Sequence, residues 1–164
     1  MQWHRFAVLI VPTLIGASCT KNPGEQELAT TIIRFVQDSV PLQQTPDLTK
    51  FTVTSIIHND GHRSVVFGGC GPEAQRNIDG QWQTIWTPIC GSPQHASIAP
   101  GDSLTVPVTV AGFTVPGIEP PLDPRMVAGI YRLRFGISYS DSINPTASNE
   151  LEALDSPAFK VYQP

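Results

Sequence analysis

Apolar and polar residues alternate with a period of two along most of the chain after residue 50. In the segment FTVTSIIH, Phe51, Val53, Ser55 and Ile57 fall on one face and the intervening residues fall on the other. This is the period of a β-strand with one buried face. The sequence NDG that follows favours a tight turn, and an extended pattern resumes at residues 64–67. The two segments are therefore predicted to pair as a hairpin.

Four more segments predict strands. Residues 81–89, 103–110 and 130–139 alternate in the same way, and residues 157–162 form a short closing segment. The turn sequences DG and PGD precede the first two of them. Pro107 has no backbone N–H, so the strand that contains it is expected to lie at a sheet edge or to carry a bulge there.

The same alternation assigns individual side chains to faces. Trp82 and Trp86 share a face, and we expect Trp82 to fill the core and Trp86 to be the more exposed of the two. In the segment of residues 130–139, Arg132 and Arg134 are predicted to point to solvent. Tyr131 is predicted to point inward, with its hydroxyl bonded to nearby backbone as in a tyrosine corner.

Composition supports an all-β fold. The chain has 164 residues, of which 16 are Pro and 13 are Gly, and both residue types disfavour long helices. Residues 27–42 fit a helix or a strand, and we favour a first strand there. Six or seven short strands separated by polar turns predict an antiparallel β-sandwich. The sequence has no βαβ rhythm of a nucleotide-binding sheet.

The N-terminal segment has the features of an export signal. Arg5 precedes a largely apolar run at residues 6–17, which is shorter than the ~20 residues that span a bilayer. Residues 14–19 (LIGASC) resemble the lipobox of bacterial lipoproteins, in which the cysteine, here Cys19, becomes the lipidated first residue of the mature chain. Gly16 stands where that pattern usually has an aliphatic residue, which leaves plain secretion and an uncleaved anchor as alternatives.

These features divide the chain into three parts. Residues 1–18 are expected to be a lipoprotein signal peptide, residues 19–28 a short tether and residues 29–164 the β-sandwich domain. The mature protein then contacts the membrane of the bacterial envelope through its N-terminal lipid, on the outer membrane if the cell is Gram-negative. A secreted or periplasmic protein is the alternative. The formal charge of −4 and only 10 Lys and Arg residues disfavour nucleic acid as a partner.

The three cysteines divide as one plus two. If lipid consumes Cys19, Cys70 and Cys90 remain as an even pair in an oxidising compartment, where disulfides persist. We expect them to be joined, which closes a loop of about 20 residues and stabilises the fold by roughly 3 kcal/mol. Two separate buried thiols are the alternative, and neither cysteine has a partner at zinc-type spacing.

Two motifs suggest chemistry without a complete site. The sequence GDSL names a family of serine esterases, but here Ser103 precedes a strand and no histidine follows His95. His58, Asp60 and His62 surround the NDG turn, and a pair of histidines with a nearby carboxylate can bind a transition metal. The sequence shows no third ligand with suitable spacing for such a site. We therefore expect a non-enzymatic protein with no metal and no cofactor.

Six segments follow one another over about residues 49–162: FTVTSIIHNDG, SVVFGGC, DGQWQTIWTPIC, IAPGDSLTVPVTV, AGIYRLRFGISY and SPAFKVY. Their order resembles that of the immunoglobulin-like domains of bacterial surface lipoproteins. A more distant similarity is to a family of bacterial proteinase inhibitors with the same N-x-G, DG-x-W and PG elements, whose inhibitory loop has no counterpart here. The resemblance implies an immunoglobulin-like antiparallel β-sandwich of about seven strands in a cell-surface setting, and it implies no activity.

One long loop is the candidate interaction site. Residues 112–126 contain four prolines, which restrict the backbone and lower the entropy cost of presenting side chains to a partner. The residues expected to form this surface are Phe113, Pro116, Ile118, Pro120, Pro121 and Leu122. The alternative is a rigid connection between two strands of one hairpin that packs on the sandwich.

Two functional hypotheses follow. The first is a non-enzymatic, lipid-anchored module of the cell envelope with a structural or protein-interaction role, whose partner is another envelope protein. The second is an inhibitor or ligand-binding protein that uses residues 112–126. The sequence leaves the oligomeric state open.

Overall fold

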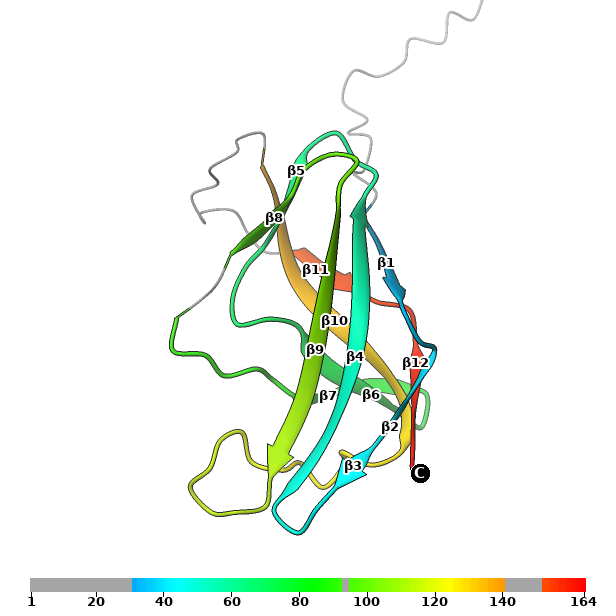
Figure 1. Cartoon of the computed structure of the whole chain (residues 1–164), viewed down its shortest axis with the longest axis vertical. Helices are drawn as coiled ribbons and strands as arrows, with labels where there is room; N and C mark the ends of the chain where they lie inside the picture. The colour runs from blue at the N-terminus through cyan, green and yellow to red at the C-terminus, as the bar shows by residue number, and fades with distance from the viewer. Residues whose placement is uncertain (1–30, 93–94, 141–151) are drawn as a thin grey trace, which may run out of the picture.

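The computed structural model describes residues 31–92, 95–140 and 152–164. Within these ranges the chain is an all-β sandwich of two sheets, as predicted (Figure 1). The predicted signal peptide, with Cys19 and the whole of the tether, lies outside the described residues. The described ranges contain no helix with the length and apolar character that a membrane span requires.

The first sheet, sheet A, is centred on one long strand. Its members are β1 (Thr31–Phe35), β3 (Gln43–Gln44), β4 (Leu48–Asn59) and β9 (Ser103–Phe113). β4 pairs with β9 in an unbroken antiparallel register along one edge, and its other edge pairs with β1 near one end and with β3 near the other. In the described chain β9 pairs with no other strand, so Pro107 lies in an edge strand, as predicted.

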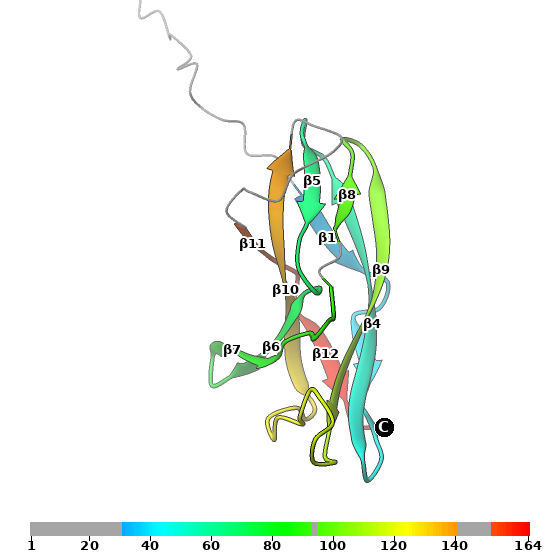
Figure 2. The same cartoon turned by 90° about the vertical axis from the view of Figure 1, so that its left-hand side faces the viewer.

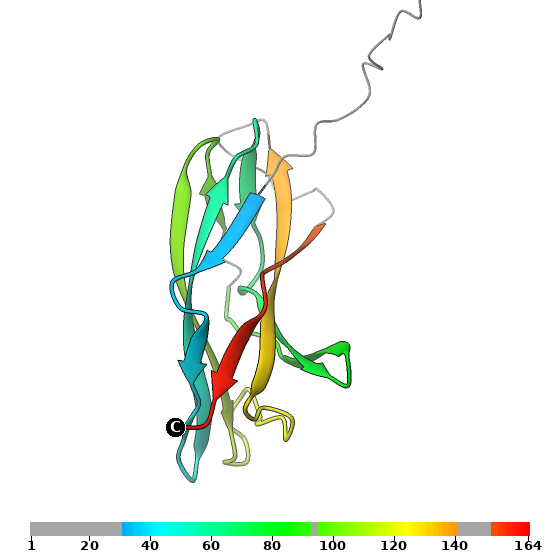
Figure 3. The ribbon, with the colours of Figure 1, turned by 90° about the vertical axis from the view of Figure 1, so that its right-hand side faces the viewer.

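The second sheet, sheet B, is built around β10 (Gly129–Ser140). Its other members are β2 (Ser39–Pro41), β5 (Ser64–Phe67), β6 (Glu73–Ile78), β7 (Gln81–Trp86), β8 (Ala96–Ile98), β11 (Glu152–Asp155) and β12 (Phe159–Tyr162). β5 and β6 pair with successive parts of β10, and so do β11 and β12. β8 extends the sheet beside β5, and β7 extends it beside β6. β2 runs parallel to β12 (Figure 3).

The number of strands is larger than the seven or so expected, because the described ranges contain twelve. The additional strands are β2, β3, β6, β8 and β11, and two of them arise at interruptions in sheet B, where β5 and β6 are separated by residues 68–72 and β11 and β12 by residues 156–158. Figure 2 shows the two sheets edge-on, with the tip of the β6–β7 hairpin projecting from the sandwich.

The predicted hairpin of residues 51–67 is wrong. β4 lies in sheet A, whereas β5 pairs with β10 and β8 in sheet B. The buried side chain of Asn59 explains the change of sheet. Its Nδ2 donates to the carbonyl oxygens of Arg63 at 2.8 Å and Ile98 at 3.0 Å, and its Oδ1 accepts the N–H of Gly61 at 3.0 Å. These bonds make the NDG sequence a corner between the sheets.

The core lies between the inward faces of the two sheets, where the predicted alternation is confirmed. Sheet A contributes Phe51, Val53 and Ile57, and β10 contributes Tyr131, Leu133, Phe135 and Ile137. The ring of Phe51 contacts those of Tyr131 and Phe159, with centroids 5.1 and 6.0 Å apart. Edge-on aromatic pairs of this kind add to the free energy gained from burial alone, so they fasten the two sheets together.

The two tryptophans occupy the opposite environments from those predicted. The register between β6 and β7 shifts at Ala74, which is paired with Trp86, and a bulge of this kind changes the face on which a side chain lies. Trp86 packs against the core and its Nε1 donates to the carbonyl oxygen of Ala111 at 2.8 Å. Trp82 is half-buried beside Arg132, whose guanidinium carbon lies 4.6 Å from the ring centroid.

Candidate functional site

The predicted interaction loop closes on itself where it leaves β9. The N–H of Phe113 donates to the carbonyl oxygen of Pro120 at 3.0 Å, and the N–H of Leu122 donates to that of Phe113 at 2.8 Å. Gly112 is required beneath this closure, because a Cβ there lies only 2.8 Å from the Cα of Leu122. The backbone at the base of the loop is therefore fixed by two hydrogen bonds and one close approach.

The six residues predicted to form the interaction surface divide into two groups. Phe113, Pro120 and Leu122 are half-buried and form the base of the loop, and Leu122 also packs against the core. Pro116, Ile118 and Pro121 are exposed. Together with their neighbours, five of the six residues, all except Pro120, line an open pocket of about 480 Å³. Half of the predicted set thus supports the loop while the other half faces solvent.

Both flanks of the loop are tied to other parts of the fold. Thr114 donates its N–H to the carbonyl oxygen of Asp47 at 3.1 Å and its hydroxyl to that of Pro46 at 2.6 Å. At the other flank, Arg125 donates to Gln83 Oε1 on β7 at 2.9 Å. The side-chain hydrogen bond from Arg125 lowers the pKa of Asp123 below its ordinary value.

The loop joins β9 in sheet A to β10 in sheet B, so it is not the connection within one hairpin that the alternative required. Where it enters β10, the hydroxyl of Tyr131 donates to the carbonyl oxygen of Val127, which confirms the predicted tyrosine corner. Burial raises the pKa of Tyr131 to about 12. The ring is fully buried, so its hydrogen bond fixes the end of the loop from inside the fold.

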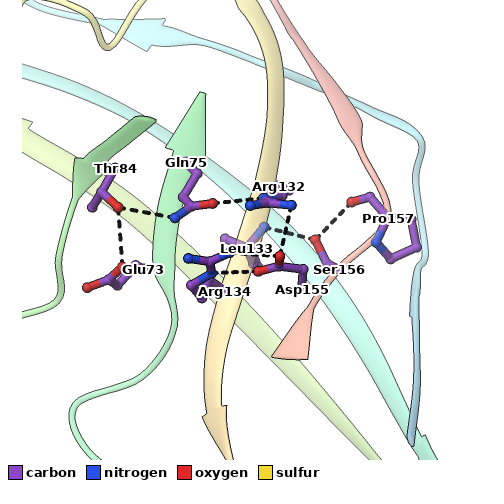
Figure 4. Close-up of polar contacts among 9 residues, drawn as sticks. All are labelled: Glu73, Gln75, Thr84, Arg132, Leu133, Arg134, Asp155, Ser156 and Pro157. Atoms are coloured by element: carbon purple, nitrogen blue, oxygen red, sulfur yellow. Dashed lines mark hydrogen bonds and ion pairs between the residues drawn. The ribbon is translucent and has the colours of Figure 1, made fainter. Parts of the chain in front are cut away.

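The outer face of sheet B carries a polar network that the sequence did not predict (Figure 4). The Asp155 carboxylate forms an ion pair with Arg134 at 2.7 Å and another with Arg132 at 2.8 Å. Arg132 also donates to Gln75 Oε1 at 2.8 Å, and Gln75 donates to the Thr84 hydroxyl at 3.2 Å. The expectation that the two arginines are merely solvated is therefore wrong, because a carboxylate distant in sequence lies between them.

This network links four neighbouring strands of sheet B, namely β7, β6, β10 and β11. The hydrogen bonds from Arg134 lower the pKa of Asp155, and burial opposes the shift. Next to the pair, Ser156 exchanges two bonds with Leu133: its Oγ accepts the Leu133 N–H at 2.8 Å and its own N–H donates to the Leu133 carbonyl oxygen at 2.8 Å. The interruption between β11 and β12 is therefore held tightly against β10.

The predicted disulfide between Cys70 and Cys90 is present, with the two Cα atoms 5.4 Å apart. Cys70 lies in the interruption between β5 and β6, and Cys90 lies between β7 and β8. The bond therefore joins the connection between β5 and β6 to the connection between β7 and β8.

The residues of the GDSL and NDG sequences meet on the outer face of sheet A. Ser103 Oγ lies 2.8 Å from His58 Nδ1, and His58 Nε2 lies 2.7 Å from Asp60 Oδ1. The sequence placed these residues in separate motifs, and the pairing of β4 with β9 brings them together. Ser103 and Asp60 are exposed and the His58 side chain is 38% exposed, so water competes with any reacting group there. Among the described residues, no group of three or more His, Cys, Asp or Glu is placed to hold a metal ion.

Comparisons with known proteins add no assignment. No protein-family model and no curated protein matches the sequence. A solved structural genomics target aligns over 83% of this chain and 85% of its own, with 14% identity and a TM-score of 0.45. A candidate ApaA protein from Bordetella pertussis aligns over 83% and 92%, with 14% identity and a TM-score of 0.44. A β-glucosidase from Listeria innocua aligns over 82% of this chain and 16% of its own, with 12% identity and a TM-score of 0.34. Likenesses of this size assign the chain neither to a family nor to a function.

Proposed function

We propose that this protein is an exported, lipid-anchored, immunoglobulin-like module of the bacterial cell envelope that binds a protein partner. Export and anchoring rest on the N-terminal signal and on Cys19. The disulfide between Cys70 and Cys90 supports an oxidising location. The tyrosine corner and the two-sheet arrangement around β4 and β10 support an immunoglobulin-like assignment.

The observation that carries the interaction role is the fixed backbone of residues 112–126. Hydrogen bonds at Phe113 and Thr114 and the contact of Arg125 with β7 hold the loop on both sides. Ile118 is nevertheless 43% exposed. A preformed apolar tip loses little conformational entropy when a partner covers it, so more of the contact energy appears as affinity.

Anchoring is tested by metabolic labelling with an alkyne fatty acid in a bacterial host that expresses the full chain. We expect label on the wild type and none on Cys19→Ala. Ser18→Ala serves as the matched control, because it changes the neighbouring residue and keeps the cysteine. A wild-type chain that carries no label contradicts the lipid anchor.

Partner binding is tested with a photoreactive benzoylphenylalanine placed at position 118 in cells. We expect a discrete crosslinked adduct that disappears when Pro116 and Pro121 are both replaced by Asp. Position 36 provides the control, since Val36 is also an exposed apolar residue, at 58%, and lies outside the loop. Equal adducts from positions 36 and 118 contradict a specific role for the loop.

A second candidate function is inhibition of a protease by insertion of the same loop into its cleft. The hydrogen-bonded closure at Phe113 favours it, because inhibitory loops act through a rigid backbone. Inhibition of a protease panel by the wild type, lost in Ile118→Asp, supports this candidate over a non-inhibitory interaction.

A further inference from the structure

An apolar pocket opens between the two sheets beside the disulfide. Its volume is about 390 Å³. The side chains that form its interior come from both sheets and face the core: Ile57, Phe67, Leu104, Val106 and Phe135. Cys70, Cys90, His95 and Ala96 lie among its remaining lining residues. The pocket therefore reaches from the segmented edge of sheet B toward the inner face of β9.

The pocket opens where sheet B is interrupted, between β5 and β6 and between β7 and β8. β5 ends at Phe67 and β6 begins at Glu73, and the residues between them include Gly68, Gly69 and Gly71. These glycines line the pocket without side chains that could fill it. The disulfide ties this segment to Cys90, which also lines the pocket.

Three of the five core-facing side chains of the pocket are only partly buried. Phe67, Leu104 and Val106 pack against the core but remain only partly buried. Apolar surface that stays in contact with water is unfavourable, and a ligand that covers it gains the free energy of burial. An apolar pocket of a few hundred Å³ with few polar groups is the usual form of a small-molecule site.

We propose that this pocket binds a compact, uncharged aromatic molecule of two or three rings. A cavity of about 150 Å³ holds benzene, so a pocket of about 390 Å³ has room for a molecule two to three times larger.

The chemistry of the lining favours the same class of ligand. The rings of Phe67 and Phe135 lie edge-on with centroids 5.8 Å apart, an arrangement that a further aromatic ring can extend. Disulfide sulfurs at the wall also make favourable contacts with ring edges. Among the described residues that line the pocket, only His95 has a titratable side chain, since the two cysteines are bonded to each other. The site thus offers no fixed charge for an anionic or cationic ligand.

The site is independent of the proposed partner surface, because no lining residue belongs to residues 112–126. Ala96 and Ser97 provide a matched pair for a test. Both are exposed residues of β8, so a larger side chain is compatible with folding at either position. Ala96 lines the pocket, whereas Ser97 points away from it.

The test is a fluorescence titration of the folded protein with N-phenyl-1-naphthylamine, an uncharged aromatic probe that brightens in apolar surroundings. We expect saturable binding at one site in the wild type, at least tenfold weaker binding in Ala96→Trp, and binding within twofold of the wild type in Ser97→Trp. Melting curves establish that the variants are folded. If Ala96→Trp does not fold, Val106→Phe narrows the pocket from β9, with the outward-facing Thr105→Phe as its control.

Three results overturn the proposal: no saturable binding by the wild type, unchanged binding by the pocket variants, or equal losses in the pocket and control variants. Stronger displacement of the probe by dodecanoate than by naphthalene overturns the ring class in favour of an acyl chain. Replacement of Ile118 by Asp is expected to leave the titration unchanged, so failure of the partner surface and failure of the pocket are distinguishable.

Discussion

Sheet A and sheet B cover the same core but differ in continuity. In sheet A, β4 and β9 remain in register from Leu48 and Phe113 to His58 and Ser103. In sheet B, β10 is the only described strand of comparable length, and its neighbours are short and interrupted. The interruptions coincide with the disulfide, the apolar pocket and the Asp155 network. The long β4–β9 pair thus forms a continuous wall of the sandwich, whereas the breaks in sheet B are where the proposed ligand pocket opens.

The largest expected effect is on the free energy of unfolding, when one phenylalanine in each region is replaced by alanine. Phe51→Ala in sheet A removes a ring that is 1% exposed, and we expect it to lower the free energy of unfolding by roughly 4 kcal/mol. Phe67→Ala beside the pocket is expected to lower it by roughly 2 kcal/mol, because that ring is only partly buried. Urea unfolding measures both. Equal losses contradict the view that the two regions differ in packing.

Removal of the disulfide is expected to have the next largest effect. The double variant Cys70→Ser and Cys90→Ser removes a link across 20 residues and is expected to lower the free energy of unfolding by roughly 3 kcal/mol. Hydrogen exchange is expected to accelerate more in β5 and β8 than in β4 and β9. Reduction of the wild type serves as the control and is expected to give the same pattern; uniform acceleration in both sheets argues against a local role.

Replacement of Asp155 by Asn tests the bracing of the segmented sheet. The variant keeps the shape of the side chain but loses its charge, and we expect a loss of roughly 1–2 kcal/mol at neutral pH. The folded-state pKa of Asp155 lies below 3.8, so the stability it contributes is present above that pH and is lost as the pH falls through the lower folded value. Stability measured from pH 7 to pH 2 should therefore fall less steeply in the variant. Identical slopes contradict the ion pair.

The smallest expected effect concerns Tyr131, which touches Phe51 where the two sheets meet. Tyr131→Phe keeps the ring and removes the bond to Val127, for an expected loss of about 1 kcal/mol. The folded pKa of Tyr131 is raised from 10.0 to about 12. Its contribution is therefore complete below pH 10 and is lost as the pH rises through the folded value. Thermal melting from pH 9 to pH 12 is expected to show this decline in the wild type and a shallower one in the variant.

Strands with a clean period of two could be predicted from the sequence, and β4, β9 and β10 are the clearest examples. Pro107 at an edge, Tyr131 at a corner and the disulfide could also be predicted, because each has a local chemical reason. The strands β2, β3 and β8 could not, since two or three residues carry no measurable period. The environments of the two tryptophans could not be predicted either. The register shift at Ala74 adds a single residue to one strand, and such an insertion is not visible in the alternation of the sequence.

The candidate loop was found from its prolines, but its support was not. Nothing in the sequence connects Thr114 with Pro46 or Arg125 with Gln83, since these contacts depend on how distant segments are stacked. The sequence predicts a hairpin turn at Asn59, whereas the structure has a corner between the sheets, because Asn, Asp and Gly are typical of both. Turn chemistry specifies that the chain reverses, whereas long-range pairing decides which strand it then joins.

The parallel pairing of β2 with β12 has a mechanical consequence. Ser39 lies opposite Lys160, and Pro41 lies opposite Tyr162, so the start of one strand lies beside the start of the other. Tension applied between an N-terminal attachment and the C-terminal residue Pro164 pulls these strands in opposite directions along their length. The load is then shared by all of their hydrogen bonds at once, as in a shear joint, whereas an antiparallel hairpin pulled from its open end breaks one bond at a time. A chain held at its N-terminal side and pulled at Pro164 therefore resists extension through the β2–β12 pair.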